Sequence, residues 1–153
     1  MQTKLHRVLC AAALALAIGP AIGDDNAPRA KATDSLATAR TLVADKKWAA
    51  AIDELKRLNE TGRADWNNLM GYSLRKGNTP DLDAAEKFYD EALRIEPKHR
   101  GALEYSGELY LMKGDLAKAE QRLAALDKAC FLPCGEYTDL KKAVQQFKAN
   151  GNR

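Results

Sequence analysis

The chain has 153 residues, of which 46% are hydrophobic, 29% charged and 7% aromatic, and 24 Lys+Arg against 21 Asp+Glu leave a net charge of +3. This composition excludes a collagen-like, low-complexity or strongly disordered protein, and the length suits one modest domain. The small positive excess also argues against nucleic acid as a partner, because proteins that bind nucleic acid usually carry a larger and more clustered basic surplus.

Residues 1–23 have the pattern of a secretory signal peptide. Two basic residues precede an apolar run of eleven residues, Val8–Ile18, which is too short to span a bilayer. A Gly-Pro pair ends the run, and small residues at 21 and 23 fit a cleavage site before residue 24. The alternative is an uncleaved anchor. We predict export of the chain, residues 24–31 as a flexible lead-in, and no stable membrane insertion after cleavage.

A period of 34 residues organises the rest of the chain. Ala51, Ala85 and Ala119 are separated by this step twice. Four further sets keep it: Trp48, Leu82 and Leu116; Ile52, Glu86 and Glu120; Leu55, Tyr89 and Leu123; and Leu58, Ala92 and Leu126. All but the Ile/Glu/Glu set are apolar, and their mutual offsets are those of one helix face. Such a period is typical of an array of helical pairs.

Capping residues, glycines and prolines place the helix ends. The expected helices run from Thr33 or Asp34 to about Ala44, from Lys46 to Glu60, from Asp65 to Lys76, from Thr79-Pro80 to just before Pro97, from about His99 to Lys113, and from Asp115 to about Lys128. No stretch alternates polar and apolar residues as a strand does. The predicted fold class is therefore all-α.

The third unit resembles a tetratricopeptide repeat, with Gly107, Tyr110, Gly114, Asp115, Ala119 and Leu123 at that family's positions. The middle unit matches it with Gly71, Leu74, Ala85, Tyr89, Ala92 and Pro97; the first, with Ala39, Leu42, Trp48, Ala51 and Leu55, lacks the glycine and the proline. The resemblance covers about residues 32–131. It implies an α-solenoid of about three helix-turn-helix units, at about 32–63, 64–99 and 100–133. The whole chain is similar to small exported repeat proteins of Gram-negative bacteria, which implies a periplasmic location.

Stacked helical pairs need close packing and a cover at the end of the array. We expect Gly71 and Gly107 where the two helices of a pair approach most closely, with Tyr89 and Leu123 filling the facing gaps. Residues 136–149 have an apolar stripe and polar residues elsewhere, as a capping helix requires; the stripe is Tyr137, Leu140, Val144 and Phe147. The alternative is a helix that binds a partner or a membrane surface. The repeat domain would span residues 32–149, followed by a tail at 150–153.

Two cysteines, Cys130 and Cys134, remain after the predicted signal cleavage. In an oxidising compartment we expect them to form a disulfide that fixes the angle of the capping helix. A redox dithiol, a metal site and intermolecular pairing are the alternatives. Cys130 follows a helix C-terminus, which disfavours a reactive thiolate, and His99 is the one histidine left as a third metal ligand. A structural disulfide is favoured, and no metal or cofactor is expected.

The sequence offers no catalytic constellation. It has no plausible Ser-His-Asp set and no glycine-rich phosphate loop. Glu104 and Glu108 lie four residues apart, a spacing that suits acid–base chemistry, but a solvated helix face is the favoured interpretation. We therefore expect the protein not to be an enzyme.

The resemblance also implies a concave groove, lined by the first helix of each unit, that binds an extended peptide or a partner helix. The groove positions map onto Arg40, Asn68, Tyr72, Arg75, Lys76, Glu104, Tyr105 and Glu108. This groove would be basic in its middle and acidic toward its C-terminal end. Some family members grip a C-terminal carboxylate with Lys, Asn and Arg, and the glutamates argue against that use here.

We thus predict a non-enzymatic protein–protein interaction module, or adaptor, in the periplasm. The alternatives are a self-assembling structural protein and a thiol-redox or metal-handling accessory that uses Cys130 and Cys134.

Overall fold

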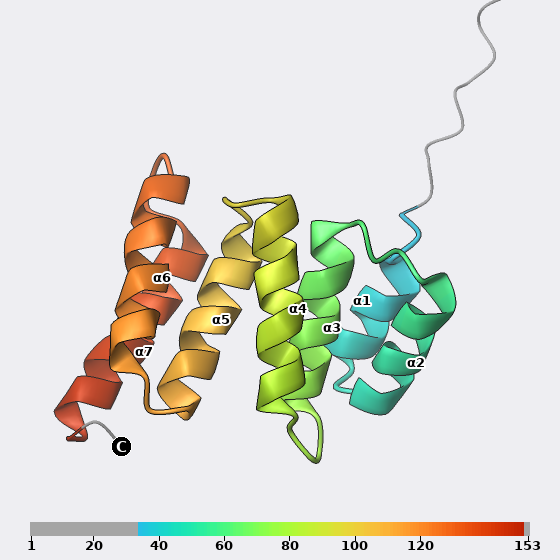
Figure 1. Cartoon of the computed structure of the whole chain (residues 1–153), viewed down its shortest axis with the longest axis horizontal. Helices are drawn as coiled ribbons and strands as arrows, with labels where there is room; N and C mark the ends of the chain where they lie inside the picture. The colour runs from blue at the N-terminus through green and yellow to red at the C-terminus, as the bar shows by residue number, and fades with distance from the viewer. Residues whose placement is uncertain (1–33, 152–153) are drawn as a thin grey trace, which may run out of the picture. The chain divides into compact units, whose positions relative to one another are not determined.

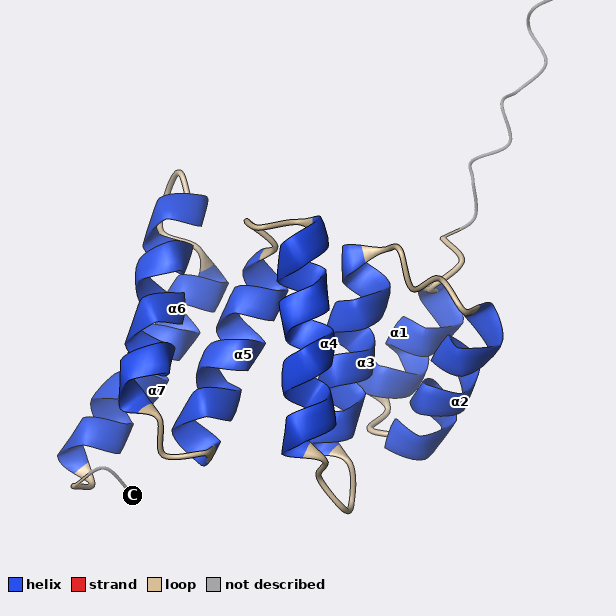
Figure 2. Cartoon of the chain, viewed as in Figure 1, coloured by secondary structure: helices blue, strands red, loops and turns tan. Residues whose placement is uncertain are grey.

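The computed structural model describes residues 34–151, which form seven α-helices and contain no strand (Figures 1 and 2). The helices are α1 (Ala37–Ala44), α2 (Trp48–Leu58), α3 (Ala64–Lys76), α4 (Leu82–Ile95), α5 (Arg100–Met112), α6 (Leu116–Ala129) and α7 (Gly135–Ala149). The predicted all-α fold class is confirmed. The predicted signal peptide, residues 1–23, and lead-in, residues 24–31, lie outside the described residues. No helix within 34–151 is long and apolar enough to cross a membrane.

Within residues 34–151 the helices form two layers. Consecutive helices pack as the pairs α1–α2, α3–α4 and α5–α6, and α7 packs against both α5 and α6. The backbones of the odd-numbered helices also approach one another in turn, from α1 to α3, α5 and α7, whereas those of α2, α4 and α6 do not. Long side chains bridge α4 and α6, as in the ion pair of Arg122 with Asp90 at 2.7 Å. Because the odd-numbered layer is the closer-spaced one, it is the concave side of a helical solenoid.

The alanines that recur every 34 residues lie where the two layers meet. Ala51, Ala85 and Ala119 are all completely buried. Their small side chains let the helices of the two layers pack closely. One core cluster centres on Leu36, Leu55 and Trp66, and a second on Tyr89, Leu109 and Leu140; Leu74 of α3 packs against both. The array is thus held together by a continuous apolar interior.

The starts of α1, α2 and α4 differ from the predicted ones. Helix α1 begins at Ala37, three or four residues later than expected, and α2 begins at Trp48 because Lys46 has a left-handed backbone, with φ of 58°. Helix α4 begins after Asp81, whose carboxylate accepts a hydrogen bond from the backbone N–H of Ala84 at 2.9 Å. A carboxylate at the N-cap satisfies an otherwise unpaired N–H, so Asp81 replaces Thr79-Pro80 as the start of this helix.

Asp65 is not the N-cap of α3, as the sequence suggested. Arg63 occupies that position with an extended backbone, and Asp65 lies in the first helical turn, where it contacts side chains of α1 and of the start of α5. A carboxylate in the first turn still interacts favourably with the helix dipole. The predicted cap at Asp115 is confirmed, since its carboxylate accepts a hydrogen bond from the N–H of Lys118. His99, expected near the start of α5, is the N-cap of that helix and accepts a hydrogen bond from the N–H of Ala102.

One of the two predicted glycine contacts is wrong. A β-carbon on Gly71 would lie 2.9 Å from ring carbons of Tyr89, as expected for a close contact within the α3–α4 pair. A β-carbon on Gly107 would instead lie 2.5 Å from Leu140 of α7, whereas Leu123 is not among its nearest neighbours. The prediction failed because α7 packs on the concave layer, as the first helix of another unit would.

Helix α7 covers the end of the array. Leu140, Val144 and Phe147 are buried, and Tyr137 packs against the same core. Cys130, at the end of α6, forms a disulfide with Cys134, directly before α7, and their Cα atoms are 6.0 Å apart. The bridge ties the capping helix to the last repeat.

Candidate functional site

Three aromatic side chains form a row that runs from the start of α2 onto the concave layer. The ring of Tyr72, on α3, lies 5.9 Å from that of Trp48, at the start of α2, and 4.5 Å from that of Tyr105, on α5, between centroids. These distances are in the range of favourable aromatic pairs. All three side chains are only partly buried, and we call them the aromatic row. The row offers a continuous apolar surface that spans all three repeat units.

The aromatic row starts beside a hollow. Trp48 borders an open pocket of about 530 Å³, which lies between the start of α2 and the turn that joins α3 to α4. Ile52 and Thr79 are among its other lining residues. A side chain of a bound segment therefore has room next to the first ring of the row.

Arg75 is buried between two rings of this row and is not a free groove residue. Only 4% of it is exposed, and its guanidinium carbon lies 5.4 Å from the ring centroid of Tyr72 and 5.6 Å from that of Tyr105. Its Nη2 is 2.6 Å from Oε2 of Glu108. Cation–π contacts and an ion pair thus engage this charge inside the chain. The predicted basic middle of the groove is wrong at Arg75.

Lys76, the other predicted basic residue of α3, lies exposed in the last turn of that helix. It has no ion pair within residues 34–151. Among the two basic residues predicted from α3, it alone keeps an accessible charge.

Glu104 is also buried, contrary to the expected solvated helix face. It is 8% exposed, and burial raises its pKa to about 8, helped by the negative charges of Glu108, Asp139 and Glu136 and opposed by Arg75. At neutral pH this carboxyl group is therefore mostly protonated. Its pKa reflects its neighbours from α7 as well as those on its own helix.

Four carboxyl groups form what we call the acidic end of the concave face: Glu104, Glu108, Glu136 and Asp139. Glu108 is paired with Arg75, and Glu136 lies 3.5 Å from Nε of Arg100. Within residues 34–151, Glu104 and Asp139 have neither an ion pair nor a side-chain hydrogen bond. The two carboxyl groups from α7 were missed because the groove was mapped only onto the first helices of the three units.

Asn68 adjoins this acidic end. It is 9% exposed, and a β-carbon on Gly101 of α5 would lie 3.1 Å from its Nδ2. Its Oδ1 is buried without a hydrogen bond. Because Gly101 is one helical turn before Glu104, the amide of Asn68 and the carboxyl of Glu104 face the same stretch of the α3–α5 contact.

Comparison with known proteins agrees with this geometry. A family model described as tetratricopeptide repeat matches residues 80–129, which contain α4, α5 and α6. This match supports a tetratricopeptide-repeat family. No curated protein and no solved structure matches the chain. Tetratricopeptide repeats are in general units of protein–protein interaction and not of catalysis, which is the coarse function that the match suggests.

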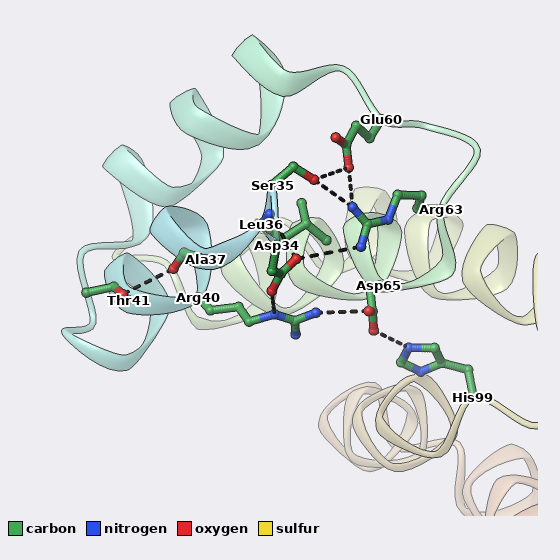
Figure 3. Close-up of polar contacts among 10 residues, drawn as sticks. All are labelled: Asp34, Ser35, Leu36, Ala37, Arg40, Thr41, Glu60, Arg63, Asp65 and His99. Carbon is green, nitrogen blue, oxygen red and sulfur yellow. Dashed lines mark hydrogen bonds and ion pairs between the residues drawn. The ribbon is translucent and has the colours of Figure 1, made fainter. Parts of the chain in front are cut away.

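The remaining predicted groove residue, Arg40, links the first helical pair to the start of α3. It donates hydrogen bonds to Asp34 at 3.1 Å and to Asp65 at 2.9 Å (Figure 3). Burial alone would raise the pKa of Asp65, but the hydrogen bond from His99 and the charge of Arg40 hold it below its usual value. The guanidinium group of Arg40 is thus engaged by two carboxylates of the chain.

His99 completes this connection by capping α5 with its ring. Its Nδ1 accepts the backbone N–H of Ala102 at 3.0 Å, and its Nε2 lies 3.0 Å from Oδ1 of Asp65 (Figure 3). A nitrogen that accepts a hydrogen bond carries no proton, so the neutral ring has its proton on Nε2 and donates it to Asp65. One imidazole therefore joins the start of α5 to the first turn of α3.

A second group of polar contacts closes the turn between α2 and α3. Arg63 donates to Oε2 of Glu60 at 2.6 Å and to the Ser35 hydroxyl at 2.7 Å (Figure 3). The hydrogen bonds from Ser35 and Arg63 hold the pKa of Glu60 below its usual value. Together with Asp34, which lies 3.7 Å from Nη2 of Arg63, these residues join the start of the first helical pair to the turn that leads into α3.

The described residues contain no group of three or more His, Cys, Asp or Glu side chains placed to hold a metal ion. The acidic end is spread over two helices, and two of its four members are paired with arginines. The aromatic row and the acidic end thus lie next to each other on the concave side.

Proposed function

We propose that this protein is a non-enzymatic interaction module that binds an extended peptide or a partner helix on its concave face. The aromatic row of Trp48, Tyr72 and Tyr105 is the observation that supports this proposal. Partly exposed aromatic rings supply large contact areas at low entropic cost and are frequent energetic centres of interfaces. Here Tyr72 and Tyr105 sit on the closer-spaced layer of the helical array, and Trp48 adjoins them from the start of α2. Such a scaffold pre-organises the rings and lowers the cost of binding.

Site-specific photo-crosslinking tests the choice of face. We would introduce a photoreactive amino acid at Tyr105, on the concave layer, and in a matched protein at Lys87, an exposed residue of α4 on the other layer. We expect adducts with a discrete partner from Tyr105 and not from Lys87, and their loss when Tyr72→Ala is added. Equal adducts at both positions, or adducts only at Lys87, would contradict binding on the concave face.

We further propose that the protein acts in the periplasm after export. The signal-like pattern of residues 1–23 supports this location, and so does the disulfide, because such bonds persist in oxidising compartments. Fractionation of expressing cells and the mass of the recovered protein test the proposal. A periplasmic protein that lacks residues 1–23 is expected, and a full-length cytoplasmic product would contradict export.

A thiol-redox role is a second candidate because of one specific placement. Cys134 is the N-cap residue of α7, and the N-terminus of a helix stabilises negative charge such as that of a thiolate. Cys130, by contrast, ends α6, where the helix dipole disfavours a thiolate. A reduction potential far below that of the compartment would mark a permanently closed disulfide and exclude this role.

Self-association is the remaining alternative. Phe131 is fully exposed and Leu132 is 72% exposed in the short loop that the disulfide closes. Large exposed apolar side chains are common contact points between chains. Sedimentation velocity over a range of protein concentrations decides this point: a mass that rises with concentration, and falls back in a Phe131→Ser variant, would favour assembly over the adaptor role.

A further inference from the structure

The acidic end holds more carboxyl groups than cations to pair with them. Of its four carboxyl groups, two are matched by Arg75 and Arg100, which leaves Glu104 and Asp139 uncompensated within residues 34–151. The unpaired Oδ1 of Asn68, in a side chain that is 91% buried, is a further acceptor at the α3–α5 contact. Two unpaired groups nearby can donate: Nε of Arg75, which belongs to the guanidinium held between two tyrosine rings, and the buried hydroxyl of Tyr89 beside it.

An excess of carboxyl groups over arginines favours a ligand that donates hydrogen bonds and carries positive charge. Lys and Arg side chains are pure donors, and their hydrogen bonds to carboxylates are among the strongest in proteins. The adjacent rings of Tyr72 and Tyr105 favour an organic cation with an apolar stem over an inorganic ion, because aromatic faces attract both the charge and the methylene groups.

We infer that the concave face selects a basic peptide segment, with a Lys or Arg side chain at the acidic end and neighbouring apolar residues on the aromatic row. The inference rests on the proposed function and adds the chemical class of the partner. It is opposite in sign to a carboxylate-binding groove. The acidic end lies next to Tyr105, the last ring of the row, so that one extended segment reaches both surfaces.

Proton linkage gives this inference a distinctive signature. The pKa of Glu104 is about 8 in the free protein because of burial, Glu108, Asp139 and Glu136, with Arg75 acting in the opposite direction. A bound cation lowers the pKa of this carboxyl, so binding near neutral pH releases a proton. Affinity for a basic peptide therefore rises from pH 6 to about pH 8 and levels off above it.

Three synthetic peptides of one design provide the probes. They share the sequence Gly-Ser-Leu-X-Leu-X-Leu-Ser-Gly, and X is Arg, Gln or Glu. Titration calorimetry with the exported protein is expected to give at least about tenfold tighter binding for the Arg peptide than for the Gln peptide, the scale of one charge-assisted hydrogen bond. The Glu peptide should bind most weakly. Two buffers of different ionisation enthalpy would report the released proton.

Variants separate the acidic end from the aromatic row. Asp139→Asn, at an exposed site on α7, and Glu104→Gln, which keeps the side-chain shape, should each reduce the Arg-over-Gln preference, and Glu104→Gln should also abolish proton release. Asp53→Asn, an exposed carboxylate on α2, is the matched control and should keep both. Tyr72→Ala/Tyr105→Ala should weaken all three peptides by similar factors.

The outcomes distinguish this inference from the function on which it rests. If all three peptides bind alike, or the Glu peptide binds best, and binding still depends on Tyr72 and Tyr105, the selection of basic segments is wrong and the concave interaction surface stands. If no peptide binds in any buffer, both are overturned. A preference for Arg that survives in Asp139→Asn and in Glu104→Gln would place the selectivity elsewhere and also contradict the inference.

Discussion

Gly107 of α5 lies directly against Leu140 of α7, so closely that a β-carbon on the glycine would stand 2.5 Å from Cδ2 of the leucine. Leu140 is completely buried and thus cannot move into solvent to make room. The absence of a side chain at position 107 therefore sets the distance between the last repeat and the helix that covers it.

The Gly107→Ala substitution is expected to destabilise the fold. Overpacking of a filled core typically costs about 1–3 kcal/mol, and the better helix propensity of alanine returns about 1 kcal/mol of that. We expect a net decrease in the free energy of unfolding, measured as a lower midpoint of urea unfolding at an unchanged slope. Gly71→Ala should behave similarly, since its β-carbon would lie 3.1 Å from the backbone oxygen of Ala85 as well as against Tyr89.

Gly135→Ala is the matched control for this prediction. Gly135 is the first residue of α7, and a β-carbon there meets no atom within 4 Å, so its replacement should be neutral or stabilising. The combination of Gly107→Ala with Leu140→Ala should cost less than the sum of the two single changes, because the cavity accepts the new methyl group. Additive losses would show that the contact with Leu140 is not the reason for glycine at 107.

His99 is expected to stabilise the array through its ring. The neutral imidazole caps α5 at Ala102 and donates to Asp65 of α3. His99→Ala should cost about 1 kcal/mol for the lost cap and more for the lost bond to Asp65. His99→Asn keeps an N-capping side chain, so thermal unfolding should rank the wild type first, Asn second and Ala last. Equal stability of the two variants would argue against capping by the ring.

The period of the sequence was enough to predict the repeats and the buried alanines. Ala51, Ala85 and Ala119 are buried at the contact between the two layers. Every unit makes this contact in the same way. The helix starts were less predictable, because Thr79-Pro80 and Asp81 are both acceptable caps and only the geometry of the turn selects Asp81. Local sequence signals thus predicted the existence of each helix more reliably than its first residue.

The burial of charged side chains was not predictable from the sequence. Glu104 and Arg75 occupy positions that are solvated on an isolated helical pair. Their burial arises from neighbours far away in sequence, such as Asp139 of α7 beside Glu104 and Tyr105 of α5 beside Arg75. The periodicity of one helix carries no information on which helix will face it, so the pairing of α5 with α7 was missed at Gly107 as well.

The disulfide is expected to stabilise the capping helix modestly. It closes a loop with a sequence separation of only four residues, so the entropic stabilisation should fall below the ~3 kcal/mol expected of a 15-residue loop. A Cys130→Ser/Cys134→Ser variant should melt at a lower temperature, and its amides in α7 should exchange faster than those in α3. Reductant should lower the melting temperature of the wild type and leave the variant unchanged. An unaltered melting temperature in both tests would exclude a stabilising role for the bond.

Glu104 should make the stability of the protein depend on pH in the neutral range. Its pKa is about 8 in the folded chain because of burial and nearby carboxylates, against about 4.3 in an unfolded chain. The folded state therefore binds this proton more tightly, and the contribution of Glu104 to stability is greatest below pH 4 and is lost as the pH rises toward 8.

The Glu104→Gln variant removes this titration, since an amide of the same shape stays neutral. Relative to the wild type, it should gain more than about 1 kcal/mol in unfolding free energy between pH 5 and pH 8.5, given 1.36 kcal/mol per pKa unit. Glu96→Gln, at an exposed site after α4, is the control and should show no such gain. Urea unfolding at the two pH values measures the difference. A Glu104→Gln effect independent of pH would mean that the carboxyl is already ionised at neutral pH, and proton release on binding a basic peptide would then not occur.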